Sequence, residues 1–267
     1  MKPNFIPEHW RDFPEIFAES LWQFDQRADT GANLLDYHGA FVPQVAEQFI
    51  QRFTNAGELV LDPMCGSGTT LAVARNLGRD SIGCDISKKA AESIRETVIQ
   101  SRSLGSGRVR IVQGDICLPE TISQLEREIR KLGHRDATLL ILHPPYFNII
   151  KFTELKSDLS QSINIDDFLT RMALVFDRVT PLVKDGGVIA VVIGDIYHKS
   201  AWFPLAFRVL DILLQEQRGL SLRGIVVKNM VNSRAKRRSS NLWRYRSLKN
   251  QTYLFSHEYI LVLRKDK

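Results

Sequence analysis

The segment LVLDPMCGSGTT, residues 59–70, predicts how the core of this chain folds. Leu59–Leu61 is a short apolar run typical of a buried strand, and a helical pattern begins at Thr69. Gly66 and Gly68 lie between them and permit a tight turn with a close approach of the backbone to a ligand. The third glycine of a dinucleotide fingerprint is absent, so a pyrophosphate is not the expected ligand.

Apolar runs and helical patterns alternate along the rest of the chain. Further strands are expected at 81–84, 109–112, 138–142, 188–193, 222–227 and 259–263, and helices at 69–77, 87–102, 119–132, 166–183 and 204–215. Strands separated by helices predict an α/β fold with a doubly wound, mostly parallel sheet, here of seven strands. The last two strands have no helix between them, so the final strand is expected to be antiparallel.

Three parts of the chain are expected from this pattern. Residues 1–55 are rich in aromatic side chains but irregular, and predict an arm packed on the core. Residues 56–227 and 257–267 would form the catalytic domain. Residues 228–256 would form a basic insert between the last two strands.

The composition is that of an ordinary soluble globular protein, with 44% hydrophobic and 25% charged residues. The sequence has no apolar run of about 18 residues that would cross a membrane, and its first residues lack the apolar part of a secretory signal. Cys65, Cys84 and Cys117 have no metal-ligand spacing, so we expect buried thiols and neither a metal site nor a disulfide. A cytoplasmic protein is therefore expected.

Acidic residues follow three successive predicted strands. Asp62 puts a negative charge where a cationic ligand could lie. Asp85 comes about 20 residues after the glycines, where an acidic residue accepts hydrogen bonds from ribose hydroxyls. Asp115 could meet an adenine ring. Since the carboxyl ends of parallel strands share one edge of the sheet, the sequence predicts a nucleoside pocket there.

Residues 62–70 resemble the glycine-loop signature of amino-methylating DNA methyltransferases, the cytosine-N4 and adenine-N6 enzymes. Residues 37–43 look like the segment that this family places beside the methionine part of its cofactor. The resemblance implies a Rossmann-like class I methyltransferase fold and S-adenosylmethionine as cofactor. The implied cofactor-binding residues are His38, Phe41, Pro43, Asp62, Pro63, Met64, Cys65, Gly66, Ser67, Gly68, Thr69, Thr70, Asp85, Ile86, Asp115 and Ile116.

The fourth predicted strand runs directly into a rigid turn formed by His143, Pro144, Pro145 and Tyr146. An exocyclic amino group is a poor nucleophile, and hydrogen bonds accepted from its N–H groups concentrate its lone pair. The Pro144 carbonyl and the side chain of His143 can accept them, and Tyr146 offers a stacking face for a flipped base. These four residues are the predicted catalytic set.

The tetrapeptide resembles the family pattern of Asp, Asn or Ser, then Pro-Pro, then Tyr, Phe or Trp, but departs from it at His143. A neutral histidine accepts one hydrogen bond, whereas a protonated one accepts none. His143 could also carry away the proton released after transfer. In this family, Asp at the first position usually accompanies adenine and Ser accompanies cytosine. Because His143 is neither, the tetrapeptide leaves the target base open. The cysteine-containing glycine loop favours cytosine N4 over adenine N6.

A basic segment without acidic residues lies between Lys228 and Lys249, with aromatic residues among its charges. It is either a solvated face or, as we favour, a phosphate-binding surface of an enzyme that acts on duplex DNA with a flipped base. Residues 147–163 form either a loop that closes over the base or a plain surface loop. The predicted nucleic-acid-binding residues are Lys151, Lys228, Arg234, Lys236, Arg237, Arg238, Trp243, Arg244, Arg246 and Lys249.

Two other functions stay open. Some RNA methyltransferases that modify a guanine amino group use a similar tetrapeptide, although they usually carry an added RNA-binding domain. A nucleic-acid-binding protein that has lost catalysis would also explain His143. If the chain is a DNA methyltransferase, a restriction endonuclease is a candidate partner.

Overall fold

The computed structural model describes residues 4–31, 41–199, 201–230 and 240–267. Its centre is an eight-stranded sheet in the order β1-β9-β10-β6-β5-β2-β3-β4. The strands are β1 (Leu21–Trp22), β2 (Leu59–Asp62), β3 (Asp80–Asp85), β4 (Val109–Gln113), β5 (Ala137–Leu142), β6 (Val183–Ile193), β9 (Leu220–Asn229) and β10 (His257–Lys265). β10 is antiparallel to both β6 and β9, whereas the remaining pairs are parallel. The predicted α/β class and final antiparallel strand are therefore confirmed.

The expected count of seven strands was wrong by one, because the amino-terminal arm contributes β1. Leu21 and Trp22 pair in parallel with Val227 and Lys228 of β9. Trp22 is buried, and its ring lies 5.4 Å from that of Phe49. The arm thus extends the sheet by a strand too short to show a periodic pattern.

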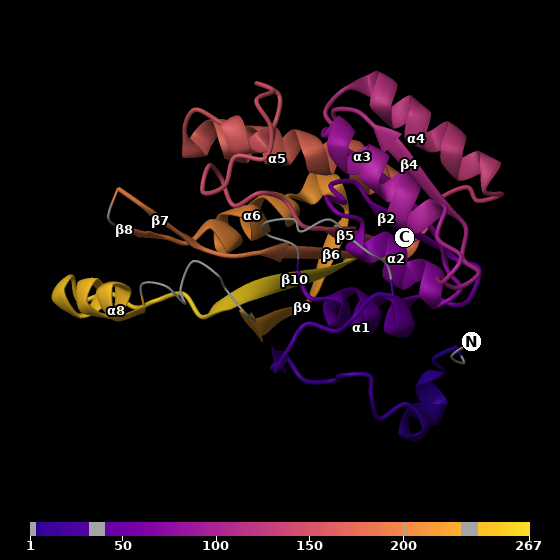
Figure 1. Ribbon diagram of the computed structural model, residues 1–267, viewed down its shortest axis with the longest axis horizontal. Coiled ribbons are helices and arrows are strands. Elements are labelled where there is room, and N and C mark those ends of the chain that lie inside the picture. The colour runs from indigo at the N-terminus through magenta and orange to yellow at the C-terminus, as the bar shows by residue number, and fades with distance from the viewer. Residues whose placement is uncertain (1–3, 32–40, 200, 231–239) are drawn as a thin grey trace.

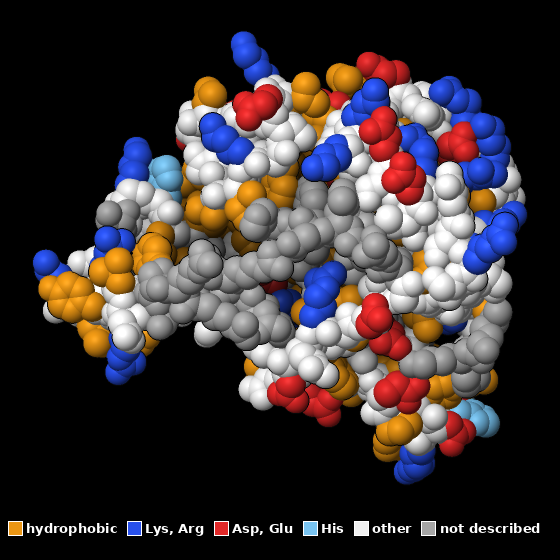
Figure 2. All heavy atoms as spheres, viewed as in Figure 1, with side chains coloured by type: hydrophobic (Ala, Val, Ile, Leu, Met, Phe, Trp, Pro, Cys, Tyr) orange, Lys and Arg blue, Asp and Glu red, His pale blue; other side chains and the backbone are white. Residues whose placement is uncertain are grey.

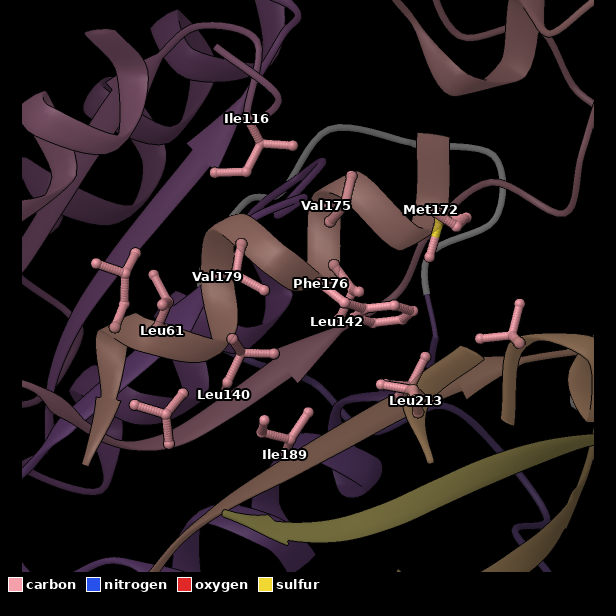
Figure 3. Close-up of a cluster of buried hydrophobic side chains, with 14 of the residues drawn as sticks. Leu61, Ile116, Leu140, Leu142, Met172, Val175, Phe176, Val179, Ile189 and Leu213 are labelled. Carbon is pink, nitrogen blue, oxygen red and sulfur yellow. The ribbon is translucent and has the colours of Figure 1, made fainter. Parts of the chain in front are cut away.

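Helices cover both faces of the sheet, as Figure 1 shows. They are α1 (Pro43–Phe53), α2 (Thr69–Asn76), α3 (Lys88–Ile94), α4 (Pro119–Lys131), α5 (Ile165–Val179) and α6 (Leu205–Leu213). Along β5, Leu140 and Leu142 face the cluster that contains α4, α5 and α6 side chains, while Leu139 and Ile141 face α1 and α2. Figure 3 shows the first of these clusters. Burial on both faces explains the continuously apolar strands.

Two expected helices are shorter than their patterns predicted. α5 ends at Val179 because Pro181 has no backbone N–H to continue the helical hydrogen bonds. α3 ends at Ile94, where a π-helical turn, Arg95–Ile99, continues the chain. Ser87 caps α3, since its hydroxyl accepts a hydrogen bond from the backbone N–H of Ala90 at 3.2 Å. None of the helices in the described ranges is long and apolar enough to cross a membrane.

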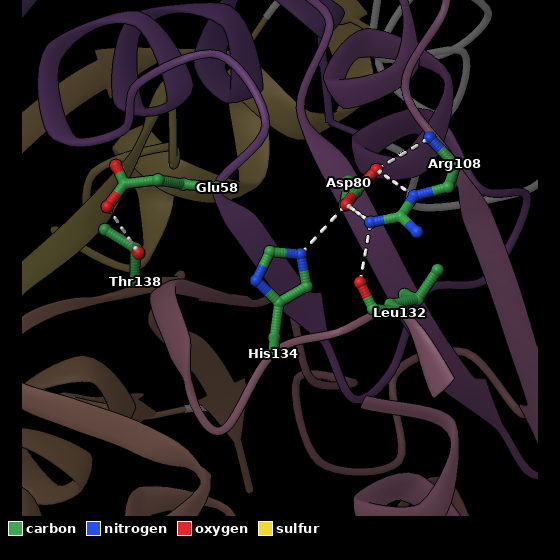
Figure 4. Close-up of polar contacts among 6 residues, drawn as sticks. All are labelled: Glu58, Asp80, Arg108, Leu132, His134 and Thr138. Carbon is green, nitrogen blue, oxygen red and sulfur yellow. Dashed lines mark hydrogen bonds and ion pairs between the residues drawn. The ribbon is translucent and has the colours of Figure 1, made fainter. Parts of the chain in front are cut away.

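Asp80, the first residue of β3, links three segments of the chain (Figure 4). Its carboxylate accepts hydrogen bonds from the backbone and guanidinium of Arg108 and contacts His134 Nε2 at 2.9 Å. Burial alone would raise the pKa of Asp80, but these hydrogen bonds lower it below its usual value. Nearby, Glu58 accepts hydrogen bonds from Thr138 and Lys184. These contacts fasten the edge of the sheet opposite to the glycine loop.

A projecting arm, which we define as residues 196–199, 201–203 and 240–256, extends beyond the sheet in Figure 1. It contains the hairpin of β7 (Ile196–His198) and β8 (Ala201–Phe203) and the helix α8 (Ser240–Lys249). The Trp202 ring lies 4.1 Å from the ring of Phe255 and 5.7 Å from that of Tyr197. This aromatic cluster joins the hairpin to the segment that leads into β10. None of these elements was expected from the sequence.

Candidate active site

The glycine loop leaves β2 after Asp62 and enters α2 at Thr69, as expected. Gly68 has a φ of +83°, and a Cβ at this position would lie 2.9 Å from Cγ1 of Ile94 on α3. Glycine is therefore required here by its backbone conformation and by the closeness of α3. The backbone N–H of Gly66 donates to Oδ2 of Asp85 at 2.8 Å, which fixes the loop against the end of β3.

Two buried carboxylates adjoin this loop. The side chains of Asp62 and Asp85 are 2% and 8% exposed, and neither forms an ion pair with another described residue. Burial raises the pKa of Asp62 to about 7, and the charge of Asp85 contributes. Burial also raises the pKa of Asp85. A cationic ligand bound beside these two carboxyl groups would stabilise their charged forms.

Asp85 is also free to bind further donors. Its two oxygens accept from the backbone N–H groups of Gly66 and Ser87, each at 2.8 Å. A carboxylate offers about four acceptor positions, so two remain for a pair of hydroxyl groups. At the end of β4, Oδ1 of Asp115 similarly accepts from the backbone of Cys117 at 2.9 Å. The donor and acceptor chemistry of this edge therefore fits the sulfonium, ribose and base of S-adenosylmethionine.

The other predicted cofactor residues are distributed around this edge. Pro63, Cys65, Ser67, Thr69 and Thr70 are buried within the loop and the start of α2, and Met64 and Ile86 are partly exposed. The side chain of Ile116 packs into the core, as Figure 3 shows. His38 lies outside the described residues. Cys65 and Cys84 are buried and Cys117 partly exposed, and all three are free.

Arg27 connects the amino-terminal arm to this site. Its guanidinium donates to the Phe41 carbonyl at 2.7 Å and to Oγ1 of Thr69 at 3.3 Å. The Phe41 ring in turn lies 5.3 Å from the ring of His143. Phe41 therefore lies close to both the glycine loop and the tetrapeptide, and the predicted contact of residues 41–43 with the cofactor stays a prediction. No local pattern distinguishes Arg27 from other arginines of the chain.

The tetrapeptide follows β5, which pairs with β2 through Val60 with Leu139 and Leu61 with Leu140. His143 and Asp62 are therefore on the same edge of adjacent strands. Nε2 of His143 lies 3.0 Å from the hydroxyl of Tyr146. Burial lowers the pKa of His143 to about 4, so its imidazole is neutral near pH 7 and able to accept one hydrogen bond.

Phe147 anchors the chain immediately after the tetrapeptide. It has a φ of +55°, which is unusual for a bulky residue, and its side chain is fully buried. Its ring packs against Phe168 of α5 and His198 of β7, at 6.1 and 5.7 Å between ring centroids. The turn is thus held at both ends, by β5 before it and by this buried ring after it. No local sequence pattern indicates the left-handed conformation of Phe147.

Lys228 was predicted to bind phosphate, and the structure contradicts this. β9 extends to Asn229, so Lys228 lies inside a strand, and its side chain is only 3% exposed. Nζ of Lys228 lies 2.7 Å from Oε2 of Glu258, which is directly opposite on β10. The positive charge is therefore held in an internal ion pair. Glu258 was not singled out from the sequence, because its role depends on this cross-strand register.

Gly194 and Asp195, which follow β6, have separate roles. A Cβ on Gly194 would lie 2.9 Å from Cε2 of Tyr146, so glycine lets the tyrosine ring pack closely. Asp195 is buried and accepts hydrogen bonds from the backbone of Ala206 and the indole of Trp202, both at 3.0 Å. The carboxylate therefore caps the first turn of α6 and holds the hairpin.

The predicted nucleic-acid-binding residues on α8 are exposed. Trp243, Arg244, Arg246 and Lys249 lie on this helix, and the Arg246 guanidinium is 5.5 Å from the Trp243 ring. Figure 2 shows hydrophobic and basic side chains gathered at this end of the molecule. Lys151 is exposed in the loop after the tetrapeptide. Arg234, Lys236, Arg237 and Arg238 lie outside the described residues.

The loop of residues 147–163 has more internal structure than its sequence indicated. Asp158 accepts hydrogen bonds from the backbone N–H groups of Thr153 and Ser160. A short 3-10 helix, Leu159–Gln161, follows.

A separate groove of about 830 Å³ lies between the amino-terminal arm and β9–β10, lined by residues such as Phe17, Trp22 and Arg223. Its lining contains none of the predicted site residues in the described part of the chain, so the chemistry is not expected there.

Comparison with known proteins gives one family and several partial relatives. The model of a DNA methylase family of the N6/N4 type matches residues 11–96 and 137–267. The type II methyltransferase M.MjaII of Methanocaldococcus jannaschii is 49% identical over 51 residues, 19% of this chain and 10% of that protein. A ribosomal protein L11 methyltransferase of Cupriavidus pinatubonensis is 37% identical over 78 residues, 29% of this chain and 23% of that protein. The aligned segments thus span a minor part of these relatives.

Solved structures share the fold at low sequence identity. A SAM-dependent methyltransferase of Methanosarcina mazei has a TM-score of 0.52 and 11% identity, over 82% of this chain and 97% of that one. The expected Rossmann-like methyltransferase architecture is therefore confirmed.

Proposed function

Because the chain belongs to the DNA methylase family of the N6/N4 type, we propose that it methylates an exocyclic amino group of a base in DNA. S-adenosylmethionine is the cofactor of this family and supplies an activated methyl group on a sulfonium centre. The observation that carries the proposal is that the tetrapeptide and the glycine loop follow adjacent strands at one edge of the sheet. A methyl donor and an amino group bound there would be neighbours.

The residues of the pocket have distinct proposed roles. The glycine loop with Asp62 would surround the cationic part of the cofactor, Asp85 would accept from its ribose hydroxyls, and Asp115 would lie near its base. A buried carboxylate favours a cation because the site has lost its water.

The tetrapeptide would prepare the amino group for attack. The Pro144 carbonyl and the neutral imidazole of His143 would accept hydrogen bonds from its two N–H bonds. Nitrogen then becomes more tetrahedral, and its lone pair points toward the methyl group. Tyr146 would stack on a base flipped out of the duplex, since a base inside the helix cannot reach this turn.

The projecting arm is the proposed DNA contact. α8 carries Arg244, Arg246 and Lys249 at the surface, and phosphate contacts by such residues account for much of the affinity of DNA-binding proteins. Trp243 adds an exposed aromatic face. We propose cytosine N4 as the target in preference to adenine N6, on the cysteine-containing glycine loop. Action in the cytoplasm beside a restriction endonuclease stays a prediction.

Methyl transfer from labelled S-adenosylmethionine to duplex DNA, single-stranded DNA and tRNA tests the proposal. Transfer to duplex DNA is expected, with 4-methylcytosine found by mass analysis of the released nucleosides; 6-methyladenine would keep the activity and change the base. The Tyr146→Ala variant should bind cofactor but lose turnover. Transfer to tRNA alone would favour the RNA guanine alternative, and cofactor binding without any transfer would favour a non-catalytic binding protein.

A further inference from the structure

The ion pair of Lys228 and Glu258 lies directly behind the tetrapeptide. Lys228 is at the end of β9 and Glu258 at the start of β10, so the two residues flank the basic insert. Their side chains are 3% and 15% exposed. A Cβ on Gly194 would lie 2.9 Å from the Tyr146 ring and 3.7 Å from Cγ of Glu258, so both side chains pack at that glycine. The pair is thus close to the catalytic turn and shielded from water.

Tyr146 lies between this ion pair and His143. Its hydroxyl oxygen lies 3.0 Å from Nε2 of His143, and its ring packs at Gly194 beside the side chain of Glu258, which acts on the same hydroxyl. Burial raises the pKa of Tyr146 well above its usual value, and Glu258 raises it further, so the phenol keeps its proton.

The direction of each bond follows from the groups present. Glu258, paired with Lys228, is the acceptor beside Tyr146, and a carboxylate only accepts, so we infer that the single hydroxyl proton of Tyr146 points to Glu258. The Tyr146 oxygen then has only lone pairs to offer His143. Nε2 of His143 must therefore carry the proton that it donates to Tyr146. A neutral imidazole has one N–H, so Nδ1 is left with a free lone pair.

We propose that Glu258, acting through Tyr146, fixes His143 as the Nε2–H tautomer, so that Nδ1 accepts a hydrogen bond from the target amino group. Nδ1 is three bonds from Cα, the same number as Oδ1 of the Asp or Asn in the family pattern. Nδ1 of His143 thereby supplies a hydrogen-bond acceptor where the Asp or Asn of the family pattern has its Oδ1. Glu258 is a positioning residue, because it acts on His143 through Tyr146. The opposite tautomer would present an N–H to the amino group and repel it. This inference rests on the proposed function.

Nitrogen-15 NMR of the histidine-labelled protein at pH 7 reads the tautomer without any substrate. The His143→Asn variant identifies the resonances of His143 among the six histidines. We expect protonated Nε2 and unprotonated Nδ1; a protonated Nδ1 would overturn the proposal. In Tyr146→Phe the hydroxyl is gone, and a mixture of tautomers is expected. A pure Nε2–H form in that variant would show that Glu258 does not set the tautomer.

Two substitutions of His143 then separate its nitrogens by activity. Asn places its oxygen at the position of Nδ1, whereas Gln places its oxygen one bond farther, at the position of Nε2. We expect kcat of His143→Asn to exceed that of His143→Gln by roughly tenfold or more, since one hydrogen bond to the amino group is at stake. Equal activity, or a more active Gln variant, would overturn the proposal. If the wild-type protein methylates no DNA, the proposed function fails, while the NMR result still decides the tautomer.

Discussion

The buried carboxylate of Asp62 should make both stability and cofactor binding depend on pH in the neutral range. Its pKa rises from 3.8 to about 7 because burial penalises the charged form. Replacing it with Asn removes the charge and keeps the shape. Without cofactor, Asp62→Asn should therefore be more stable than the wild type at pH 8, although the substitution removes a residue of the pocket.

The magnitude follows from linkage between protonation and folding. A carboxyl group whose pKa is higher in the folded than in the unfolded state stabilises the folded protein while it is protonated. This stabilisation is complete when the pH is below the unfolded pKa, and it is lost as the pH rises through the folded pKa. Between pH 5 and pH 8, a pKa of about 7 against 3.8 changes the free energy of unfolding by about 3 kcal/mol. The difference in stability between Asp62→Asn and the wild type should grow by this amount over that interval.

Urea denaturation at several pH values measures this difference. Asp80→Asn is a matched control, because the pKa of Asp80 is lowered and its contribution should not vary between pH 5 and pH 8. Calorimetry in two buffers adds an independent test. Near pH 6 a bound cation should displace close to one proton from the wild type, and none from Asp62→Asn. If the free energies of unfolding of the wild type and of Asp62→Asn change with pH in parallel, the reasoning is refuted, since Asp62 would then be ionised throughout.

Three further perturbations test other parts of the structure. Lys228→Met should lower the free energy of unfolding by about 3 kcal/mol in urea, because it leaves the Glu258 carboxylate buried without a partner; the double variant with Glu258→Gln should recover most of this. A double variant as unstable as the single one would contradict the ion pair. Asp80→Ala should cost about 2 kcal/mol at pH 7, and this difference should disappear as pH falls through the lowered pKa of Asp80; an undiminished cost at pH 2, by thermal unfolding, would disprove it. Arg246→Ala and Arg244→Ala should each weaken DNA binding and reduce its salt dependence by about one counterion, measured by fluorescence anisotropy; unchanged salt slopes would remove α8 from the interface.

Local sequence patterns were sufficient for much of the fold and for the two motifs. The glycine loop, the Pro-Pro turn and the Ser87 cap depend on residues next to one another, and a strand or helix pattern repeats within a few residues. The alternation of these patterns gave the parallel sheet. Since parallel strands end at one edge, the order of motifs also indicated that Asp62, Asp85 and His143 would lie near each other.

What the tertiary structure decided involves residues far apart in the chain. Glu258 reaches Tyr146 only because β10 is inserted between β6 and β9, and the register of this antiparallel pairing sets which side chains face each other. The same register buries Lys228, which by sequence alone resembles the exposed arginines of the insert. Charge and residue type are local properties, whereas burial depends on the neighbours that folding supplies. The sequence therefore determined which side chains the candidate site contains, and the packing of β9 and β10 decided what surrounds Tyr146 and His143.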